Sequence, residues 1–160
     1  MRAFIGVGSN VGRREEQIAR AIALLRASPD ITVLRQAALY ETEPVGIEDQ
    51  PWFINTAVEV ETDLPPLELL RRLKEIERLV GRRERGRWEM REIDLDLLLY
   101  GDLVLEGAEL ALPHPQLDRR RFVLEPLVEL APELIHPRLQ KRLRQLLAEL
   151  EDEKKVIRTG

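Results

Sequence analysis

Asp94 and Asp96 lie one residue apart in an apolar run that extends from Ile93 to Tyr100. In a helix, residues at i and i+2 point to different sides, whereas in a strand they share one face and stand roughly 6–7 Å apart. Three consecutive leucines before Tyr100, followed by Gly-Asp, are typical of a buried strand that ends in a turn. We therefore expect both carboxylates to project together from one face of a sheet.

Two carboxylates on an apolar strand require a neutralising cation, because burying like charges side by side is costly. Magnesium suits such a pair, since Mg²⁺ takes one or two carboxylates and completes its shell with water and phosphate oxygens. Ion pairs with nearby arginines would neutralise the pair equally well. The Asp94/Asp96 pair alone leaves both interpretations open.

An arginine-rich stretch, residues 82–91, comes directly before this strand and is called the arginine flap here. Guanidinium groups bind phosphate through paired, planar hydrogen bonds, so a flap of them can close over a polyphosphate held on metal. A solvated loop would explain any single arginine of the group. The combination of flap and aspartate pair favours nucleotide triphosphate chemistry. The flap contains five arginines: Arg82, Arg83, Arg85, Arg87 and Arg91.

His114 lies between two prolines, which hold its backbone extended. A histidine on such a loop can donate to phosphate oxygens or take part in proton transfer. A histidine bonded to backbone in a turn is an equally good explanation. The cluster Arg119, Arg120 and Arg121 follows closely and favours a phosphate-binding role, whereas His136 has no such neighbours and is assigned a structural role.

Asn55 is a lone amide on the strand face shared by Phe53 and Ala57. A buried amide needs partners, which can be backbone groups or a heterocyclic ligand. Phe53 and Phe122 offer flat surfaces that could enclose an aromatic ring, although an ordinary core position is the favoured interpretation for both. For Asn55 taken alone, a structural hydrogen-bond partner is the favoured interpretation.

The glycines of the first turn, Gly6, Gly8 and Gly12, resemble a phosphate loop between a strand and a helix. Their spacing does not match the dinucleotide-binding pattern, and no Gly-Lys-Ser/Thr follows. A tight structural turn is the favoured interpretation.

The composition indicates one soluble domain that covers residues 1–160. The chain has 25 Lys and Arg against 29 Asp and Glu, so its net charge of −4 argues against a general nucleic-acid binder. It has no cysteine, which excludes disulfides and thiolate metal sites. No signal peptide or membrane-length apolar run is present. We expect a cytoplasmic monomer with no membrane partner and a charged, frayed end over residues 151–160.

Hydrophobic periodicity predicts alternating strands and helices along the chain. Pro65-Pro66 is expected to begin the second helix and Gly81 to end it. This order, β-α-β-β-α-β, is that of an α+β, ferredoxin-like sheet with helices packed on one face of it, a single-domain α/β sandwich. The expected strands cover residues 4–8, 31–40, 53–62 and 93–100, with one arm of a hairpin at 103–107, and the expected helices cover 15–26, 66–80, 122–130 and 138–150.

Taken together, the motifs resemble the 6-hydroxymethyl-7,8-dihydropterin pyrophosphokinase family, folate-pathway enzymes that transfer pyrophosphate from ATP to a pterin alcohol. The resemblance is specific because several separate motifs occur in the order that the family has. They are Ile5–Asn10, Tyr40–Gly46, Asp49–Asn55, Arg91–Asp96, Pro113–Pro115 and Ala131–Leu134.

The resemblance implies that Asp94 and Asp96 hold two magnesium ions that bridge the ATP phosphates and the pterin hydroxymethyl oxygen. It implies contacts to the triphosphate from Arg82, Arg91, His114 and Arg120. It places Leu70, Lys74, Glu77, Trp88, Leu97 and Leu110 around the nucleotide, with Lys74 where a glutamine is frequent. It further implies that Thr42, Pro44, Val45 and Asn55 contact the pterin edge while Phe53 and Phe122 stack on its two faces.

Two other functions are consistent with parts of the sequence. In a ferredoxin-like regulatory or binding module, Asp94 and Asp96 would pair with arginines, and nucleotide binding would not need magnesium. A kinase that moves only the γ-phosphoryl group would release ADP in place of AMP.

Overall fold

The computed structural model describes residues 1–9, 13–43, 52–81, 93–152 and 156–159. The arginine flap with Arg82, Trp88 and Arg91, and the predicted pterin contacts Pro44 and Val45, lie outside the described residues. The described strands are β1 (Arg2–Ser9), β2 (Ile31–Gln36), β3 (Tyr40–Thr42), β4 (Phe53–Thr62), β5 (Asp94–Tyr100), β6 (Leu105–Glu106), β7 (Ala111–Leu112) and β8 (Val156–Arg158). The described helices are α1 (Arg14–Ala27), α2 (Pro66–Gly81), α3 (Arg121–Leu130) and α4 (Leu143–Glu149).

The main sheet is antiparallel, with strand order β5-β1-β4-β3-β8, and β2 pairs with the other half of β4. The predicted β-α-β-β-α-β order and ferredoxin-like class are confirmed by this topology. The strand predicted over residues 31–40 is divided into β2 and β3, which pair with different halves of β4. The hairpin arm predicted at 103–107 contains β6, which pairs with β7.

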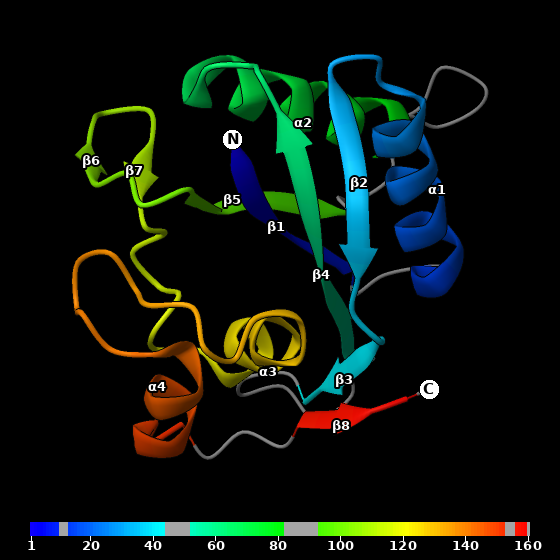
Figure 1. Ribbon diagram of the computed structural model, residues 1–160. Coiled ribbons are helices and arrows are strands. Elements are labelled where there is room, and N and C mark those ends of the chain that lie inside the picture. The colour runs from blue at the N-terminus through cyan, green and yellow to red at the C-terminus, as the bar shows by residue number, and fades with distance from the viewer. Residues whose placement is uncertain (10–12, 44–51, 82–92, 153–155, 160) are drawn as a thin grey trace.

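Helices cover both faces of the sheet, whereas the sequence predicted them on one face, because the chain continues beyond β5 into α3 and α4. Helices α1 and α2 pack on one face through residues such as Ile18, Leu69 and Leu73, while α3 and α4 pack on the other through Leu124 and Leu143. Figure 1 shows α2 across the top and α1 at the right, with α3 below the centre and α4 at the lower left. Alternating strand residues therefore enter two separate cores.

Strand β5 changes its register against β1 between Phe4 and Ile5, with the result that Leu98 and Leu99 both enter the core beneath α3. Such a bulge places two residues of one strand opposite one of its partner. Leu95 and Leu97 enter the opposite core, beneath α1 and α2. The bulge therefore adds a second leucine to the core beneath α3, close in the strand to the two aspartates.

The final helix is shorter than predicted, because α4 begins only at Leu143. Residues before it form a turn in which Gln140 has a φ of 59°, and the Nδ1 atom of buried His136 accepts hydrogen bonds from the N–H groups of Arg138 and Leu139. The left-handed backbone of Gln140 is incompatible with helix at this position. The prediction of helix over 138–142 is wrong, whereas the structural role assigned to His136 agrees with these hydrogen bonds.

Part of the chain end forms a strand, which its charge did not indicate. Residues Val156–Arg158 form β8, which pairs with β3 at the sheet margin. In Figure 1, β8 lies beside β3 below the other strands.

Candidate active site

A cavity of about 290 Å³ lies between the sheet and α3. Strands β1, β3, β4 and β5 form its floor and sides, and the first turn of α3 completes it. The lining residues include five of the polar candidates from the sequence: Thr42, Asn55, Asp94, Asp96 and Arg120, together with Phe53 and Phe122. Five elements distant in sequence are therefore needed to build one site.

Asp94 and Asp96 are both exposed and line this cavity, which confirms that they share a strand face. In the sheet they stand opposite Gly8 and Gly6 of β1, respectively. Among the described residues, Asp96 forms no ion pair with an arginine or lysine. The carboxylate of Asp96 therefore remains available to a cation in the cavity.

Gly8 lies between the acidic and the amide side of the cavity, because it pairs with Asp94 on one neighbouring strand and with Asn55 on the other. A Cβ atom at Gly8 would stand 2.5 Å from Oδ1 of Asn55. No side chain larger than hydrogen fits there without moving the amide. Gly6 and Gly8 lie within β1, as the strand predicted over residues 4–8 requires.

Asn55 is 8% exposed, and its Nδ2 atom donates to Oγ1 of Thr42 at 3.4 Å. Thr42 stands on β3, where it pairs with Phe53 of β4. The bond is long, so it constrains the amide orientation weakly. Asn55 has a structural partner, as expected, and its amide also borders the cavity.

Arg120 and Phe122 approach the cavity from the start of α3. The guanidinium carbon of Arg120 lies 5.6 Å from the centre of the Phe122 ring, within the range of a cation–π contact. The first turn of α3 therefore brings a cation and an aromatic face to the cavity together.

His114 lies close to Asp96, Arg120 and Lys74, whose charges all act on its imidazole. Burial lowers the pKa of His114 below its ordinary 6.5; Asp96 opposes this shift, while Arg120 and Lys74 add to it. Its Nδ1 atom accepts a hydrogen bond from the N–H of Gln116 at 3.1 Å. The neutral ring consequently carries its proton on Nε2, which can act as a donor.

Glu77 and Lys74 of α2 hold the outer margin of β5, a function that the sequence analysis did not predict. Oε2 of Glu77 accepts a hydrogen bond from the Leu95 N–H at 2.6 Å, and Nζ of Lys74 lies 3.1 Å from the same oxygen and 3.5 Å from the Leu95 carbonyl oxygen. Their signal in the sequence was their position four and seven residues after Leu70, on one stripe of α2 beside its buried face.

The predicted nucleotide contacts Leu97 and Leu110 are 2% and 9% exposed and belong to the core beneath α1 and α2, and Leu70 packs against that core. They lie outside the cavity lining. Their contact with a nucleotide stays a prediction.

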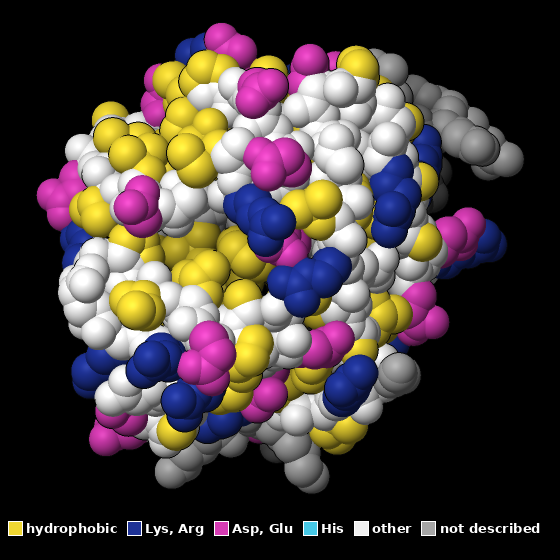
Figure 2. Space-filling model, in the orientation of Figure 1, with side chains coloured by type: hydrophobic (Ala, Val, Ile, Leu, Met, Phe, Trp, Pro, Cys, Tyr) yellow, Lys and Arg dark blue, Asp and Glu magenta, His cyan; other side chains and the backbone are white. Residues whose placement is uncertain are grey.

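The surface carries charged side chains of both signs (Figure 2). Figure 2 shows basic and acidic side chains interspersed over the face in view, around apolar groups at its left. In the described part of the chain, no helix is long and apolar enough to cross a membrane.

The antiparallel ferredoxin-like sheet and its cavity, where carboxylates, a buried amide and an aromatic wall meet, define an α+β protein with a polar small-molecule site. The chain belongs to the 7,8-dihydro-6-hydroxymethylpterin-pyrophosphokinase family, whose model matches residues 4–132. The predicted family and its enzyme class, pyrophosphokinase, are thereby confirmed.

Similar proteins agree with this membership. A 2-amino-4-hydroxy-6-hydroxymethyldihydropteridine pyrophosphokinase of Bacillus subtilis is 44% identical over 82% of this chain and 79% of its own length. One of Aquifex aeolicus is 41% identical over 91% of this chain and 90% of its own. The solved structure of Plasmodium falciparum HPPK-DHPS wild type with SDX-DHP has a TM-score of 0.71 at 19% identity, over 92% of this chain. This chain spans 43% of that solved chain, so the likeness concerns the fold of one part of it.

Proposed function

We propose that this protein transfers pyrophosphate from ATP to the hydroxymethyl group of 6-hydroxymethyl-7,8-dihydropterin and releases AMP, as a step of folate biosynthesis. The carrying observation is that one cavity joins two exposed carboxylates to a buried amide and an aromatic wall. A site for two substrates needs both parts within reach of one another. Family membership supports the same assignment.

The amide side of the cavity suits the pterin. Asn55 and Thr42 supply donors and acceptors for the edge of the heterocycle, and Phe53 and Phe122 supply apolar surfaces for its faces. A site with precisely placed polar groups rejects rings that lack the matching groups, because its own polar atoms would then stay unpaired. The volume of about 290 Å³ lies near the lower end of small-molecule pockets, as expected for a two-ring ligand.

The acidic side suits magnesium and the triphosphate. Among the described residues no group of three or more acidic or histidine side chains converges on one point, so protein ligands alone would not complete a metal shell. Two carboxylates that leave positions for water and phosphate oxygens match the preference of Mg²⁺. Two magnesium ions held by Asp94 and Asp96 would neutralise phosphate charge and align the substrates when bound.

Basic residues of this chain position the triphosphate and neutralise its negative charge. Arg120 and the Nε2–H of His114 donate to phosphate oxygens, while Lys74 adds positive charge next to His114. In the reaction the hydroxymethyl oxygen bonds to the β-phosphorus of ATP, the bond from that phosphorus to the bridging α,β-oxygen breaks, and the hydroxyl proton is released. Transfer of this kind depends on alignment and charge neutralisation more than on covalent help.

The test is a product assay with ATP, the hydroxymethyl pterin and magnesium. We expect AMP and the pterin diphosphate in equal amounts, separated by anion-exchange chromatography. ADP as the product would instead identify a γ-phosphoryl kinase. Calorimetry with a non-hydrolysable ATP analogue should show binding only when magnesium is present. Equal binding with and without magnesium would favour the alternative function, a ferredoxin-like regulatory or binding module.

A further inference from the structure

The chain end contacts both walls of the cavity, although it lies beyond the residues 4–132 that match the family model. Two described parts make these contacts, Asp152 and strand β8, and together they are called the C-terminal brace here. One part meets the start of α3, and the other meets β3.

Asp152 binds the first turn of α3. Its Oδ2 atom accepts a hydrogen bond from the Arg121 N–H at 3.0 Å, and its backbone oxygen accepts one from Nε of Arg121 at 3.3 Å. The N-cap residue Arg120 makes no side-chain capping bond of its own. A carboxylate from a distant segment therefore satisfies an N–H group that the helix cannot, at the end where negative charge is favoured.

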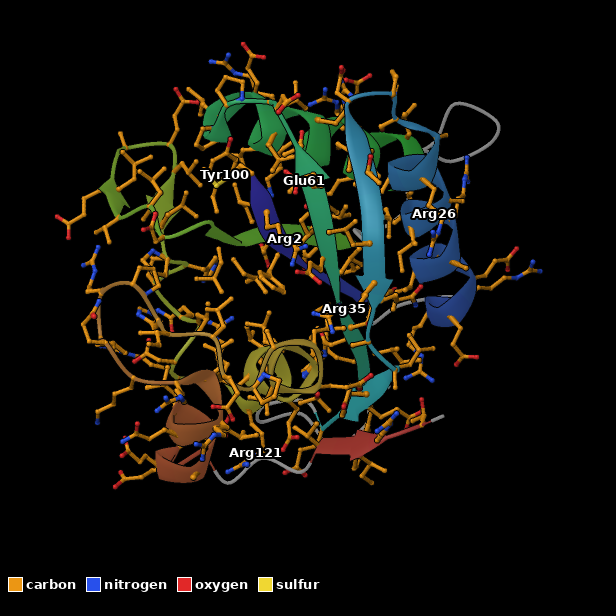
Figure 3. All side chains as sticks on the ribbon, viewed as in Figure 1. Arg2, Arg26, Arg35, Glu61, Tyr100 and Arg121 are labelled. Carbon is orange, nitrogen blue, oxygen red and sulfur yellow. The ribbon has the colours of Figure 1, made fainter. Side chains whose placement is uncertain are left out.

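The helix start that Asp152 holds is the cavity wall. Phe122 follows Arg121 directly and Arg120 precedes it, and both line the cavity. In Figure 3 the Arg121 side chain lies below α3, between α4 and β8. A shift of this backbone would displace the Phe122 ring, because the two residues share one helical turn.

Strand β8 binds the opposite wall. Thr42, which lines the cavity, pairs with Val156, and the Thr159 N–H donates to the carbonyl oxygen of Leu39 at 2.8 Å. The three-residue strand β3 is thus held between β4 and β8. Short strands depend on their neighbours for their position.

A third contact joins the same elements at the other end of α3. Glu129 accepts a 2.6 Å hydrogen bond from the Tyr40 hydroxyl of β3, and its carboxylate lies 3.9 Å from Arg158 of β8. Burial raises the pKa of Tyr40, and Glu129 adds to this, so the hydroxyl remains a donor. Helix α3, β3 and β8 therefore form one connected unit around the cavity.

We propose that the C-terminal brace fixes the distance between Phe122 on α3 and Thr42 on β3, and thereby sets the affinity for the pterin. This inference rests on the proposed function, since it names the pterin as the ligand between these walls. Asp152 is a positioning residue in this arrangement, because it acts through the backbone of Arg121. Among the described residues, the hydrogen bonds and ion pairs of the brace reach α3 and β3 and do not involve Asp96 of β5 or Lys74 of α2. Of the residues assigned to the triphosphate, Arg120 lies next to the brace, because it precedes Arg121.

The test compares Asp152→Ala with Asp152→Asn, since asparagine keeps an acceptor oxygen for the Arg121 N–H. Loss of a charge-assisted hydrogen bond predicts a roughly 5- to 10-fold rise in the pterin Kd for the alanine variant. Affinity for a non-hydrolysable ATP analogue with magnesium should fall less than the pterin affinity, because of the residues assigned to the triphosphate only Arg120 adjoins the brace, and the asparagine variant should recover most of the pterin affinity. Isothermal calorimetry measures both constants, and thermal unfolding confirms that each variant is folded.

Glu149→Ala is the matched control, because it removes the Lys141 ion pair from the same end of the chain without touching a cavity wall. Ile157→Pro tests the β8 contact separately by removing a backbone N–H, and should also weaken pterin binding. An unchanged pterin Kd in Asp152→Ala, or an equal loss for both ligands, overturns the inference. If the unaltered protein binds no pterin at all, the proposed function fails instead.

Discussion

The carboxylate of Glu77 accepts a 2.6 Å hydrogen bond from the N–H of Leu95, the residue that separates Asp94 from Asp96. Strand β5 lies at the margin of the sheet that the described residues form, where this N–H has no described strand to pair with. Glu77 takes the place of that strand, and Lys74 partly neutralises it. The helix behind the sheet thereby fixes the backbone from which both aspartates project.

We expect Glu77→Ala to lower both the free energy of unfolding and the catalytic rate. The substitution leaves the Leu95 N–H without its acceptor, at a cost of about 1–3 kcal/mol in the free energy of unfolding. Displacement of Asp94 and Asp96 should also raise the magnesium concentration needed for half-maximal rate. Urea unfolding and magnesium titrations of AMP formation measure these effects. Glu75→Ala, an exposed position on the same helix, should change neither.

Asp96→Ala should lower the rate of AMP formation by at least ~10²-fold, because the site loses one of two carboxylates that counter the charge of the bound cations. The fold should survive, since the Asp96 side chain is exposed. Steady-state assays and circular dichroism separate the two effects. Asp102→Ala, just beyond the same strand, provides the control. Unaltered turnover in Asp96→Ala would contradict the metal-site assignment.

Gly8→Ala should impair pterin binding more than ATP binding. The new Cβ would lie 2.5 Å from Oδ1 of Asn55, so the amide or the strand must shift, at a cost of roughly 1–3 kcal/mol. We expect a rise of about 10-fold or more in the pterin KM, which corresponds to the lower part of that range. Gly81→Ala is the matched control, because no described atom lies within 4 Å of its added Cβ. Equal KM values for Gly8→Ala and the unaltered protein would show that Asn55 does not contact the pterin.

The sequence predicted what depends on local periodicity. The shared face of Asp94 and Asp96 follows from strand geometry, and the bounds of β4 match the prediction because its residues alternate clearly. Contacts that depend on distant backbone groups left no periodic signal. The capping of Arg121 by Asp152 and the pairing of Thr42 with Val156 are of this kind.

The helix predicted over 138–150 failed for a related reason. Its apolar spacing is helical, yet the His136 imidazole satisfies the N–H groups of Arg138 and Leu139 from outside any helix. A local side-chain bond of this kind competes with helix formation, and hydrophobic spacing does not report it.

The same histidine should make stability depend on pH. Burial lowers the pKa of His136 below 6.5; nearby Asp118 opposes this shift and Arg138 adds to it. Its Nδ1 atom accepts two N–H groups only while it carries no proton. The neutral imidazole is therefore favoured in the folded state.

We expect the free energy of unfolding to be unaffected by His136 above pH 6.5 and to decrease as the pH falls below it, because the unfolded chain then binds the proton more readily. His136→Asn should reduce this slope, since an amide oxygen accepts the same N–H groups and does not titrate in this range. Urea unfolding at intervals from pH 8 to pH 5 measures the slope. The pKa of His114 is lowered in the same sense, so part of the slope should persist until its asparagine variant is added. An undiminished slope in His136→Asn would mean that protonation of this turn does not govern acid stability.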